Sequence, residues 1–235
     1  AVKGSLLKSD PNLKLVDISH NIEQHDVAHG SFVLKYIYRH YPPGTIHMAS
    51  VNAVNSTRFI AILLQGYFFV GADNGLFSLI TQELPEKIVE LDNTYRSPFP
   101  ALDILAPAAA ALAGGQNLES VGTLSEEYYR LMPRQVKATR KQISGSVIRV
   151  SHYGNLITNI EASEFSFLSR DKQFQILLGR ERIHKIHDSP RSTDPGDCFV
   201  IFNDLGLLEI GINQGHAAEL LGLAYDSPVH IIFSE

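Results

Sequence analysis

The sequence predicts an α/β N-terminal domain with a largely parallel sheet, followed by an all-β, barrel-like C-terminal domain. Three observations lead to this fold class. Helix-like and strand-like patterns alternate along the first half, a polar and basic stretch over 132–145 interrupts them, and short β-branched runs with frequent turns fill the rest. We expect the two domains to cover 1–138 and 139–235.

The N-terminal domain begins with a helical pattern that has no start signal, and the true N-terminal strand is expected to be missing from the sequence. An apolar strand follows, then an amphipathic helix with Asp26 as its N-cap, then a second strand after a Pro-Pro-Gly turn. This strand–helix–strand order favours a parallel sheet. In chain order these elements are 1–9, 13–19, 26–41 and 45–52.

The rest of this domain starts with a hairpin, because two apolar runs flank Gln65-Gly66. Asp73 resembles a cap at the start of the next segment, and a short strand follows. An alanine-rich helix, with Pro107 in its first turns and two glycines at its end, is expected after that. These segments cover 58–72, 73–84, 86–91 and 101–115.

The C-terminal domain shows mostly strand patterns, which favours a small barrel or sandwich. One short helix over 214–222 interrupts the strands, with Asn213 as its expected cap and Gly222 as its stop. The strand-like segments are 146–160, 173–186, 198–203, 207–213 and 229–235.

Composition narrows the function classes. The formal net charge is −5 and no long basic run occurs, so a nucleic-acid partner is not expected. No apolar run reaches the length of a membrane span, and no signal peptide pattern is present, so no membrane partner is expected. The single cysteine, Cys198, rules out an internal disulfide and fits a cytoplasmic protein.

The stretch SHYGNLITNI, residues 151–160, combines strand-forming residues with an aromatic ring and two amides. In an extended strand, Tyr153 and Asn155 would share one face with only Gly154 between them. A ring can then stack on a flat ligand while the amide donates to or accepts from the ligand's edge. The alternative is a strand that enters a turn at Tyr-Gly-Asn, where the asparagines satisfy loop backbone.

Two other polar segments are candidates for a binding site. The loop VNAVNSTR, 51–58, follows a strand where α/β sheets place ligands, and it carries Asn52 and Arg58. Asn203 and Asp204 lie at a glycine turn between two strands. The alternatives are a polar loop with a solvated arginine and an ordinary hairpin turn.

No metal site is expected. The two histidines of HKIH, 184–187, would point to opposite faces of a strand, and no distant cysteine or histidine pattern completes a site. Cys198 has no histidine at a telling position, so it is interpreted as a small buried side chain rather than a nucleophile.

Taken together, the segments resemble the S-adenosyl-L-methionine hydroxide adenosyltransferase family, which is related to the fluorinase and chlorinase enzymes. The matching stretches run in the family's order over nearly the whole chain: VDISHNI, YPPGTIH, VGADNGLFSL, DILAPAAAALAGG, GSVIRVSHYGNLITNI and GLLEIGINQGHAAELLGL. The resemblance implies S-adenosylmethionine as the substrate and no further cofactor. It also implies a homotrimer that binds this ligand between the N-domain of one subunit and the C-domain of the next.

The resemblance also assigns residues. Tyr153 and Asn155 match the aromatic and asparagine that cradle the adenine end of the ligand, and Ser151 stands where the family has an aspartate. Asn203 and Asp204 complete the substrate-binding candidates. The N-terminal DFG segment, with an aspartate for the ribose hydroxyls, is not in the sequence.

The family's VDPGVGxxR loop supplies an aspartate and an arginine that help to activate water. In this chain Asn52 replaces the acid and Arg58 is retained, so these two residues are the catalytic candidates. The family's FHGRDIFAP segment supplies a histidine, which Pro100 replaces. An amide cannot take a proton and proline has no functional side chain, so the residues leave open whether the protein is an enzyme.

Three functions remain open from the sequence. In a hydrolase, water or hydroxide attacks C5′ of S-adenosylmethionine and gives adenosine and L-methionine, with Asn52 orienting the water and Arg58 lowering its pKa. A non-catalytic or weakly active binder of S-adenosylmethionine or adenosine is the second. The third is a halide-using adenosyltransferase, with Asn55, Ser56 and Thr57 lining an anion pocket.

Overall fold

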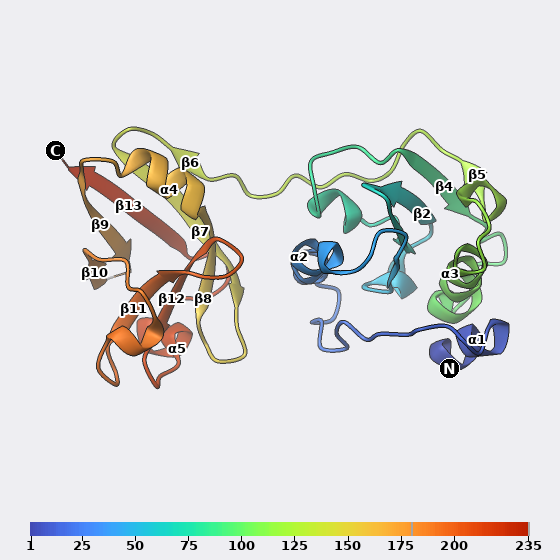
Figure 1. Ribbon diagram of the computed structural model, residues 1–235, viewed down its shortest axis with the longest axis horizontal. Coiled ribbons are helices and arrows are strands. Elements are labelled where there is room, and N and C mark those ends of the chain that lie inside the picture. Colours follow the sequence, from blue (N-terminus) through green and yellow to red (C-terminus); the bar gives the residue numbers. More distant parts are fainter. Residues whose placement is uncertain (180, 235) are drawn as a thin grey trace. The chain divides into compact units, whose positions relative to one another are not determined.

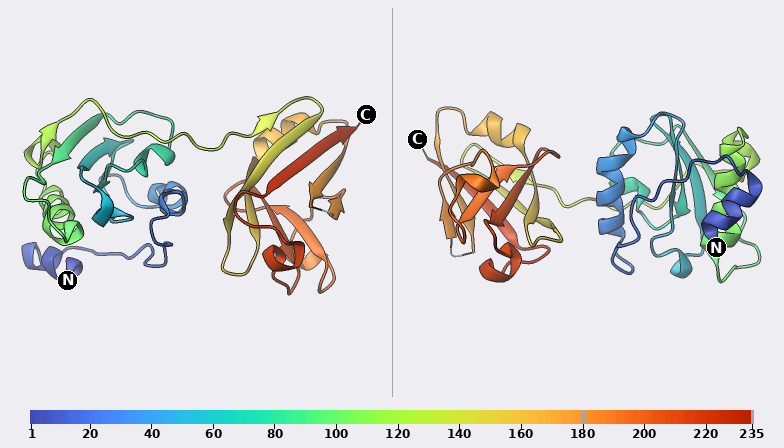
Figure 2. Two further views of the ribbon diagram at one scale, coloured as in Figure 1. Left: turned by 180° about the vertical axis from the view of Figure 1, so that it is seen from behind. Right: turned by 60° about the horizontal axis from the view of Figure 1, so that its bottom comes forward.

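The computed structural model describes residues 1–179 and 181–234, and it divides into two compact units, Ala1–Pro133 and Arg134–Glu235 (Figures 1 and 2). The first unit combines a sheet with helices and the second is built around an antiparallel sheet, so the predicted class, an α/β domain followed by an all-β, barrel-like one, is confirmed. The division comes before residue 138 because β6 (Lys137–Ala138) pairs with β7 (Gln142–Val150) of the second unit.

A five-stranded sheet forms the centre of the N-terminal unit, with the order β1-β3-β2-β4-β5. Its helices and strands are α1 (Val2–Ser9), α2 (Val27–Ile37), β1 (Ile46–Ala49), β2 (Phe59–Leu64), β3 (Tyr67–Ala72), β4 (Lys87–Leu91), α3 (Ala106–Ala113) and β5 (Thr123–Leu124). Short helical turns separate them: η1 (Tyr38–His40), η2 (Ala53–Asn55), η3 (Phe77–Leu79), η4 (Ala101–Leu105) and η5 (Leu118–Ser120).

This sheet is mixed rather than largely parallel. β1 runs parallel to β3, whereas β2 pairs antiparallel with both β3 and β4. The cause is the hairpin predicted at Gln65-Gly66, which the structure confirms: both residues have positive φ, 52° and 77°, as a tight turn between adjacent strands requires.

The two faces of the sheet are covered by different helices. Along β2, Phe59 and Ala61 pack in one core cluster with α3, while Ile60 and Ile62 pack in the other with α2. This alternation follows from the two-residue period of a strand. The unit therefore has three layers, with the sheet between α2 on one face and α3 on the other. α1 lies against α3 (Figure 1).

The predicted strand over 13–19 is wrong. These residues have no regular secondary structure, and they pair with no strand in the part of the chain that the structure describes. Val16 is 65% exposed, and Asp17 forms ion pairs with Lys3 and His20. An apolar alternating pattern makes a strand only where a neighbouring strand completes the hydrogen-bond ladder.

The predicted helix over 101–115 is present, and it starts with a wide turn. The Ala106 N–H donates to Ala101 O, which makes η4 a turn of π-helix that runs directly into α3. Pro107, the second residue of α3, has no N–H to donate to Asp103, which explains why regular helical bonding gives way here.

The C-terminal unit is an eight-stranded antiparallel sheet that wraps into a nearly closed, barrel-like shape. The sheet runs β10-β9-β13-β7-β8-β12-β11, and β6 joins it beside β7. Besides β6 and β7 the elements are β8 (Leu156–Glu161), α4 (Ala162–Leu168), β9 (Gln173–Leu178), β10 (Glu181–Ile183), η6 (Pro190–Ser192), β11 (Cys198–Phe202), β12 (Leu207–Ile212), α5 (Ala217–Leu221) and β13 (Pro228–Ser234).

The core of this unit comes from inward-facing residues of nearly every strand. Ile143, Leu156, Ile176, Val200 and Ile231 are each fully buried within one cluster. The predicted strands over 173–186 and 229–235 include residues 180 and 235, which lie outside the described residues. Across 1–179 and 181–234, none of the helices has both the length and the apolar character needed to cross a bilayer.

Two local predictions for this unit differ from the structure. Residues 151–155 form a turn between β7 and β8, which agrees with the alternative of a turn at Tyr-Gly-Asn and not with one continuous strand over 146–160. α5 is capped by His216, whose Nδ1 accepts from the Glu219 N–H, and not by Asn213. Gly222 ends this helix with φ 65°, as predicted.

Candidate functional site

The turn over 151–155 presents its aromatic side chain to solvent. The Ser151 N–H donates to Asn155 O at 2.8 Å, and the Asn155 N–H donates to Ser151 Oγ at 3.1 Å. Gly154 takes φ +84° and lies against the ring of His216, which a Cβ would meet at 2.4 Å. Tyr153 stands at the tip with 79% of its surface exposed, so its ring is available to a ligand.

Beside this turn lies a hollow of about 440 Å³. Its walls come from the turn, from the end of β12 and the residues leading into α5, and from residues on η6 and β11. The lining residues are Tyr153, Asn155, Pro190, Phe199, Ile212, Asn213, Gln214, Gly215 and His216. Aromatic and apolar walls with a few amides are typical of sites for flat organic ligands.

Glu209 holds two of the predicted site residues together. Asn155 Nδ2 donates to its Oε1 at 2.7 Å, and Asn203 Nδ2 donates to its Oε2 at 2.9 Å. An ionised carboxylate only accepts, so the nitrogen of the Asn155 amide must face Glu209. The carbonyl Oδ1 is then the atom of Asn155 that can accept a hydrogen bond from a ligand in the hollow.

Gly211 makes room for this arrangement. A Cβ at residue 211 would approach Phe199 at 2.1 Å and Asn155 Oδ1 at 2.8 Å. The missing side chain therefore lets the ring and the amide oxygen lie close together on one wall of the hollow.

Two of the other predicted binding residues, Ser151 and Asn203, hold the turn and the hairpin in shape through hydrogen bonds. Ser151 closes the turn, and Asn203 Oδ1 accepts from the backbone of Leu205 and Leu207 in the β11–β12 hairpin. Asp204 is exposed in that hairpin and is not among the residues that line the hollow. The structure thus brings Asn155 and Asn203 together through Glu209, whereas Asp204, the next residue after Asn203, is exposed.

Sequence reasoning missed Glu209. Its signal is a single acid within the apolar run LLEIGI of β12, since a charge in a largely buried strand needs partners. The second amide of the SHYGNLITNI stretch, Asn159, has a structural role instead. Its Oδ1 accepts from the Ser146 N–H at 2.8 Å, where β7 and β8 shift register.

A separate polar cluster lies in the N-terminal unit, in the loop after β1. Asn52 has left-handed backbone geometry with φ 52°. Its Oδ1 lies 2.8 Å from Asn55 Nδ2 and 2.9 Å from His25 Nδ1. His25 was not predicted from the sequence, because its position ahead of the α2 cap carries no spacing signal.

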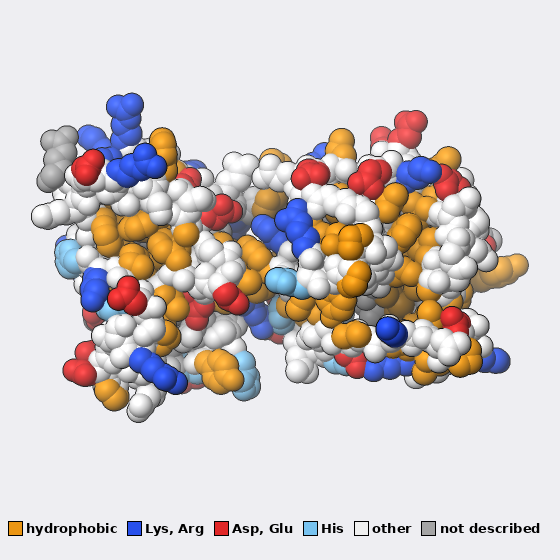
Figure 3. Space-filling view, viewed as in Figure 1, with side chains coloured by type: hydrophobic (Ala, Val, Ile, Leu, Met, Phe, Trp, Pro, Cys, Tyr) orange, Lys and Arg blue, Asp and Glu red, His pale blue; other side chains and the backbone are white. Residues whose placement is uncertain are grey.

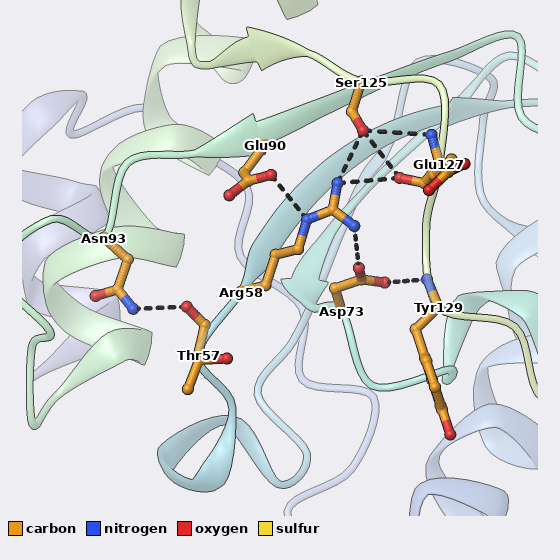
Figure 4. A network of polar contacts seen from close by, with 8 residues as sticks. All are labelled: Thr57, Arg58, Asp73, Glu90, Asn93, Ser125, Glu127 and Tyr129. Carbon is orange, nitrogen blue, oxygen red and sulfur yellow. Dashed lines mark hydrogen bonds and ion pairs between the residues drawn. The ribbon is translucent and has the colours of Figure 1, made fainter.

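Arg58 is held in a network of its own (Figure 4). Its Nε donates to Glu90 at 2.8 Å, its Nη1 to Asp73 at 2.7 Å, and its Nη2 to Ser125 Oγ and Glu127 O at 2.8 and 3.0 Å. Among the described residues, the hydrogen bonds of Arg58 do not include one to Asn52, the other catalytic candidate. Asp73, only 3% exposed in its side chain, also accepts from the Tyr129 N–H at 2.7 Å.

This network fastens the segment 125–129 to the ends of β2, β3 and β4. Arg58 therefore has a structural role whether or not it acts on a ligand. Pro100 is buried and directly precedes η4, a position that suits proline at a helix start.

The described residues contain no group of three or more histidines, cysteines or acids arranged to hold a metal ion. Within the HKIH segment, His187 contacts the backbone of Val200 through Nδ1. Cys198 is partly buried, and desolvation, with Glu181 and Asp197 nearby, raises the pKa of its thiol to about 11. Charged side chains of both signs are interspersed on the face shown in Figure 3.

The fold and the hollow define a class of protein: an α/β unit followed by a barrel-like β unit that carries an aromatic and amide recess. Comparison with protein families narrows this class. The N-terminal domain of the SAM hydroxide adenosyltransferases matches residues 1–122, and the C-terminal domain matches 145–230. The chain belongs to the SAM hydroxide adenosyltransferase family, which confirms the resemblance seen in the sequence.

Individual relatives agree with this assignment. The chain is 28% identical to an (R)-S-adenosyl-L-methionine hydrolase of Methanocaldococcus jannaschii, over 99% of this chain and 90% of that protein. It is 23% identical to a fluorinase of an Actinoplanes species, over 92% and 86%. A crystal structure of an uncharacterized conserved protein from Thermotoga maritima matches with a TM-score of 0.88 and 27% identity, over 98% and 93%.

Proposed function

We propose that the protein hydrolyses S-adenosylmethionine, with water attacking C5′ of the ribose and L-methionine leaving, so that adenosine is the second product. The observation that carries this proposal is the hollow beside Tyr153, where a carboxylate fixes the Asn155 amide. Family membership and the hydrolase names of several relatives support the same reaction.

In this proposal the hollow receives the adenine. The exposed ring of Tyr153 stacks on the base, and Asn155 Oδ1 accepts from its 6-amino group, since the amide nitrogen is engaged with Glu209. Ser151 and Asn203 contribute by shaping the turn and the hairpin that carry these groups. Asp204, exposed at the hairpin, is proposed to contact the polar end of the ligand.

The water-activating part of the proposal rests on the loop after β1. Asn52 occupies the position that the family's acid holds, and its side chain orients the attacking water. Arg58 is kept as a second catalytic candidate, although Asp73 and Glu90 offset much of its charge. The sulfonium is a good leaving group, so alignment and exclusion of bulk water supply part of the rate.

We also propose a homotrimer that binds the substrate between subunits and acts in the cytoplasm. The proposal is that the subunit interface covers large apolar side chains that are exposed on the N-terminal unit of a single chain. They include Val54, Tyr95, Phe99, Leu124, Tyr129 and Met132. The single Cys198, without a partner for a disulfide, supports the compartment.

The test combines calorimetry with chromatography of the products. Tyr153→Ala should weaken adenosine binding by about 1–3 kcal/mol through lost stacking, and Asn155→Ala should weaken adenosine more than a ligand without the base. Tyr225→Ala, another exposed tyrosine of the same unit, is the matched control. Unchanged binding in both site variants would refute the adenine assignment.

Product analysis separates the alternatives. Release of adenosine and L-methionine without added halide supports the hydrolase. Binding without any product identifies a non-catalytic binder, and a product that forms only with halide identifies a halide-using adenosyltransferase.

A further inference from the structure

His25, Asn52 and Asn55 form a compact cluster in the N-terminal unit, although 27 residues of sequence separate the first two. Asn52 Oδ1 is its centre, with Asn55 Nδ2 at 2.8 Å and His25 Nδ1 at 2.9 Å. Asn55 Nδ2 also lies 3.2 Å from His25 Nδ1. Asn55 and His25 therefore share Asn52 Oδ1 as an acceptor.

The shared acceptor sets the tautomer of the histidine. Asn55 donates to the Asn52 side-chain atom in the shorter of its two contacts, so that atom is the carbonyl oxygen. An oxygen of an amide only accepts, so His25 Nδ1 must carry a proton to bond with it. In the neutral ring Nε2 then has a bare lone pair and can accept a proton.

The backbone fixes both partners. His25 and Asn52 each adopt left-handed geometry, with φ 63° and 52°, which is uncommon outside glycine and often found at functional sites. His25 directly precedes Asp26, whose carboxylate accepts from the His29 N–H at 2.8 Å and anchors the start of α2. The Ser56 hydroxyl donates to Asn52 O at 3.1 Å and anchors the other loop.

We propose that His25 is the general base of the hydrolysis and that Asn52 is its positioning residue; the inference rests on the proposed function. The oxygen of water forms a bond to C5′ while the C5′–S bond breaks, and its electron pair leaves on the sulfur of L-methionine. The proton of the water passes to His25 Nε2. The imidazolium keeps its Nδ1–H on Asn52 and later releases the other proton to solvent.

This assignment explains how the chain can catalyse hydrolysis although Asn52 and Pro100 replace the acid and the histidine of the family's motifs. An amide at residue 52 cannot take a proton, but it can orient a ring that does. An exposed imidazole that is held by its other nitrogen meets both requirements of a base: a free lone pair and a fixed direction.

The test measures adenosine release and S-adenosylmethionine binding in parallel. His25→Gln keeps a donor for Asn52 but cannot accept the proton, so turnover should fall by about 10²–10⁴-fold while the dissociation constant stays within about twofold. His184→Ala, an exposed histidine of the other unit, is the matched control and should turn over as wild type does. Free imidazole should restore part of the activity of His25→Ala, which a purely structural role would not allow.

Asn52→Asp gives an independent check. A carboxylate stabilises the imidazolium, so this change should raise turnover on the order of tenfold in the presence of His25 and leave it unchanged in His25→Gln. If His25→Gln and His25→Ala both release adenosine at the wild-type rate, the role of His25 is wrong, while the proposed hydrolase function still stands. Wild type that binds ligand and releases no product would overturn the proposed function, and this inference with it.

Discussion

At the residue scale, the proposed adenine site depends on how one carboxylate orients the Asn155 amide. Both oxygens of Glu209 accept from amide nitrogens, one from Asn155 and one from Asn203, at 2.7 and 2.9 Å. A fixed acceptor favours a purine with a 6-amino group over one with a 6-oxo group. In the proposed binding mode, the selectivity of the hollow therefore depends on Glu209, which need not touch the ligand.

Glu209→Gln should reduce this selectivity. A glutamine has one donor and one acceptor end, so it can satisfy only one of the two asparagines as the wild type does. We expect wild type to favour adenosine over inosine by about 2 kcal/mol and the variant to lose most of that difference. Calorimetry with both nucleosides measures it, and Glu161→Gln, an exposed acid of the same unit, should behave as wild type.

Arg58→Ala should destabilise the N-terminal unit. It leaves the nearly buried carboxylate of Asp73 without its arginine partner, which costs about 3 kcal/mol in unfolding free energy. Denaturant unfolding of this variant and of Arg130→Ala, an exposed arginine, measures the difference. A variant as stable as wild type would contradict the structural role, whatever happens to turnover.

At the element scale, β1 carries a histidine that is kept neutral by its surroundings. His47 is 3% exposed and stacks on Phe69 with ring centroids 5.2 Å apart. Its Nε2 is buried and has no hydrogen-bond partner among the described residues. Burial lowers the pKa of His47 to about 4, well below its ordinary value of 6.5.

The sign of the effect follows from proton binding. Between pH 6.5 and 4 the unfolded state takes up a proton at this residue and the folded state does not, so stability is full above pH 6.5 and falls as the pH is lowered. The loss should reach about 3 kcal/mol at pH 4. His47→Phe should lose less unfolding free energy than wild type between pH 7 and 4.5, and equal losses would contradict the assignment.

At the scale of the whole molecule, the proposed trimer predicts that exposed aromatic side chains of the N-terminal unit become covered on association. Tyr95 and Phe99, between β4 and η4, are 94% and 66% exposed. Light scattering at micromolar concentration should give a mass three times the 26.0 kDa of one chain. Tyr95→Asp should lower that mass, whereas Phe167→Asp on α4 should not; a monomeric wild type would refute the trimer.

Much of the architecture could be predicted because the signals are local. The Gln65-Gly66 turn, the Asp26 cap and the Gly222 stop each depend on residues a few positions apart, and the structure confirms all three. For residues 151–155 the sequence offered both a continuous strand and a turn at Tyr-Gly-Asn, because apolar residues on both sides continue the two-residue period of a strand; the structure has the turn.

The sites were harder to predict because their contacts are distant in sequence. Glu209 reaches Asn155 across 54 residues, and His25 reaches Asn52 across 27. The segment 13–19 illustrates the same limit for strands: its apolar pattern is typical of a strand, but it has no pairing partner in the described chain. Local patterns indicated which loops carry polar groups, and only the fold shows which groups meet.

The raised pKa of the partly buried Cys198 thiol has a practical consequence. With a pKa of about 11, almost none of it is thiolate at neutral pH, so alkylating reagents and disulfide exchange should leave it untouched while β11 stays in place. β11 is the last strand of its sheet, paired with β12 alone in the described chain. The rate at which iodoacetamide labels Cys198 should therefore report how often this edge strand opens by local unfolding, without an engineered cysteine.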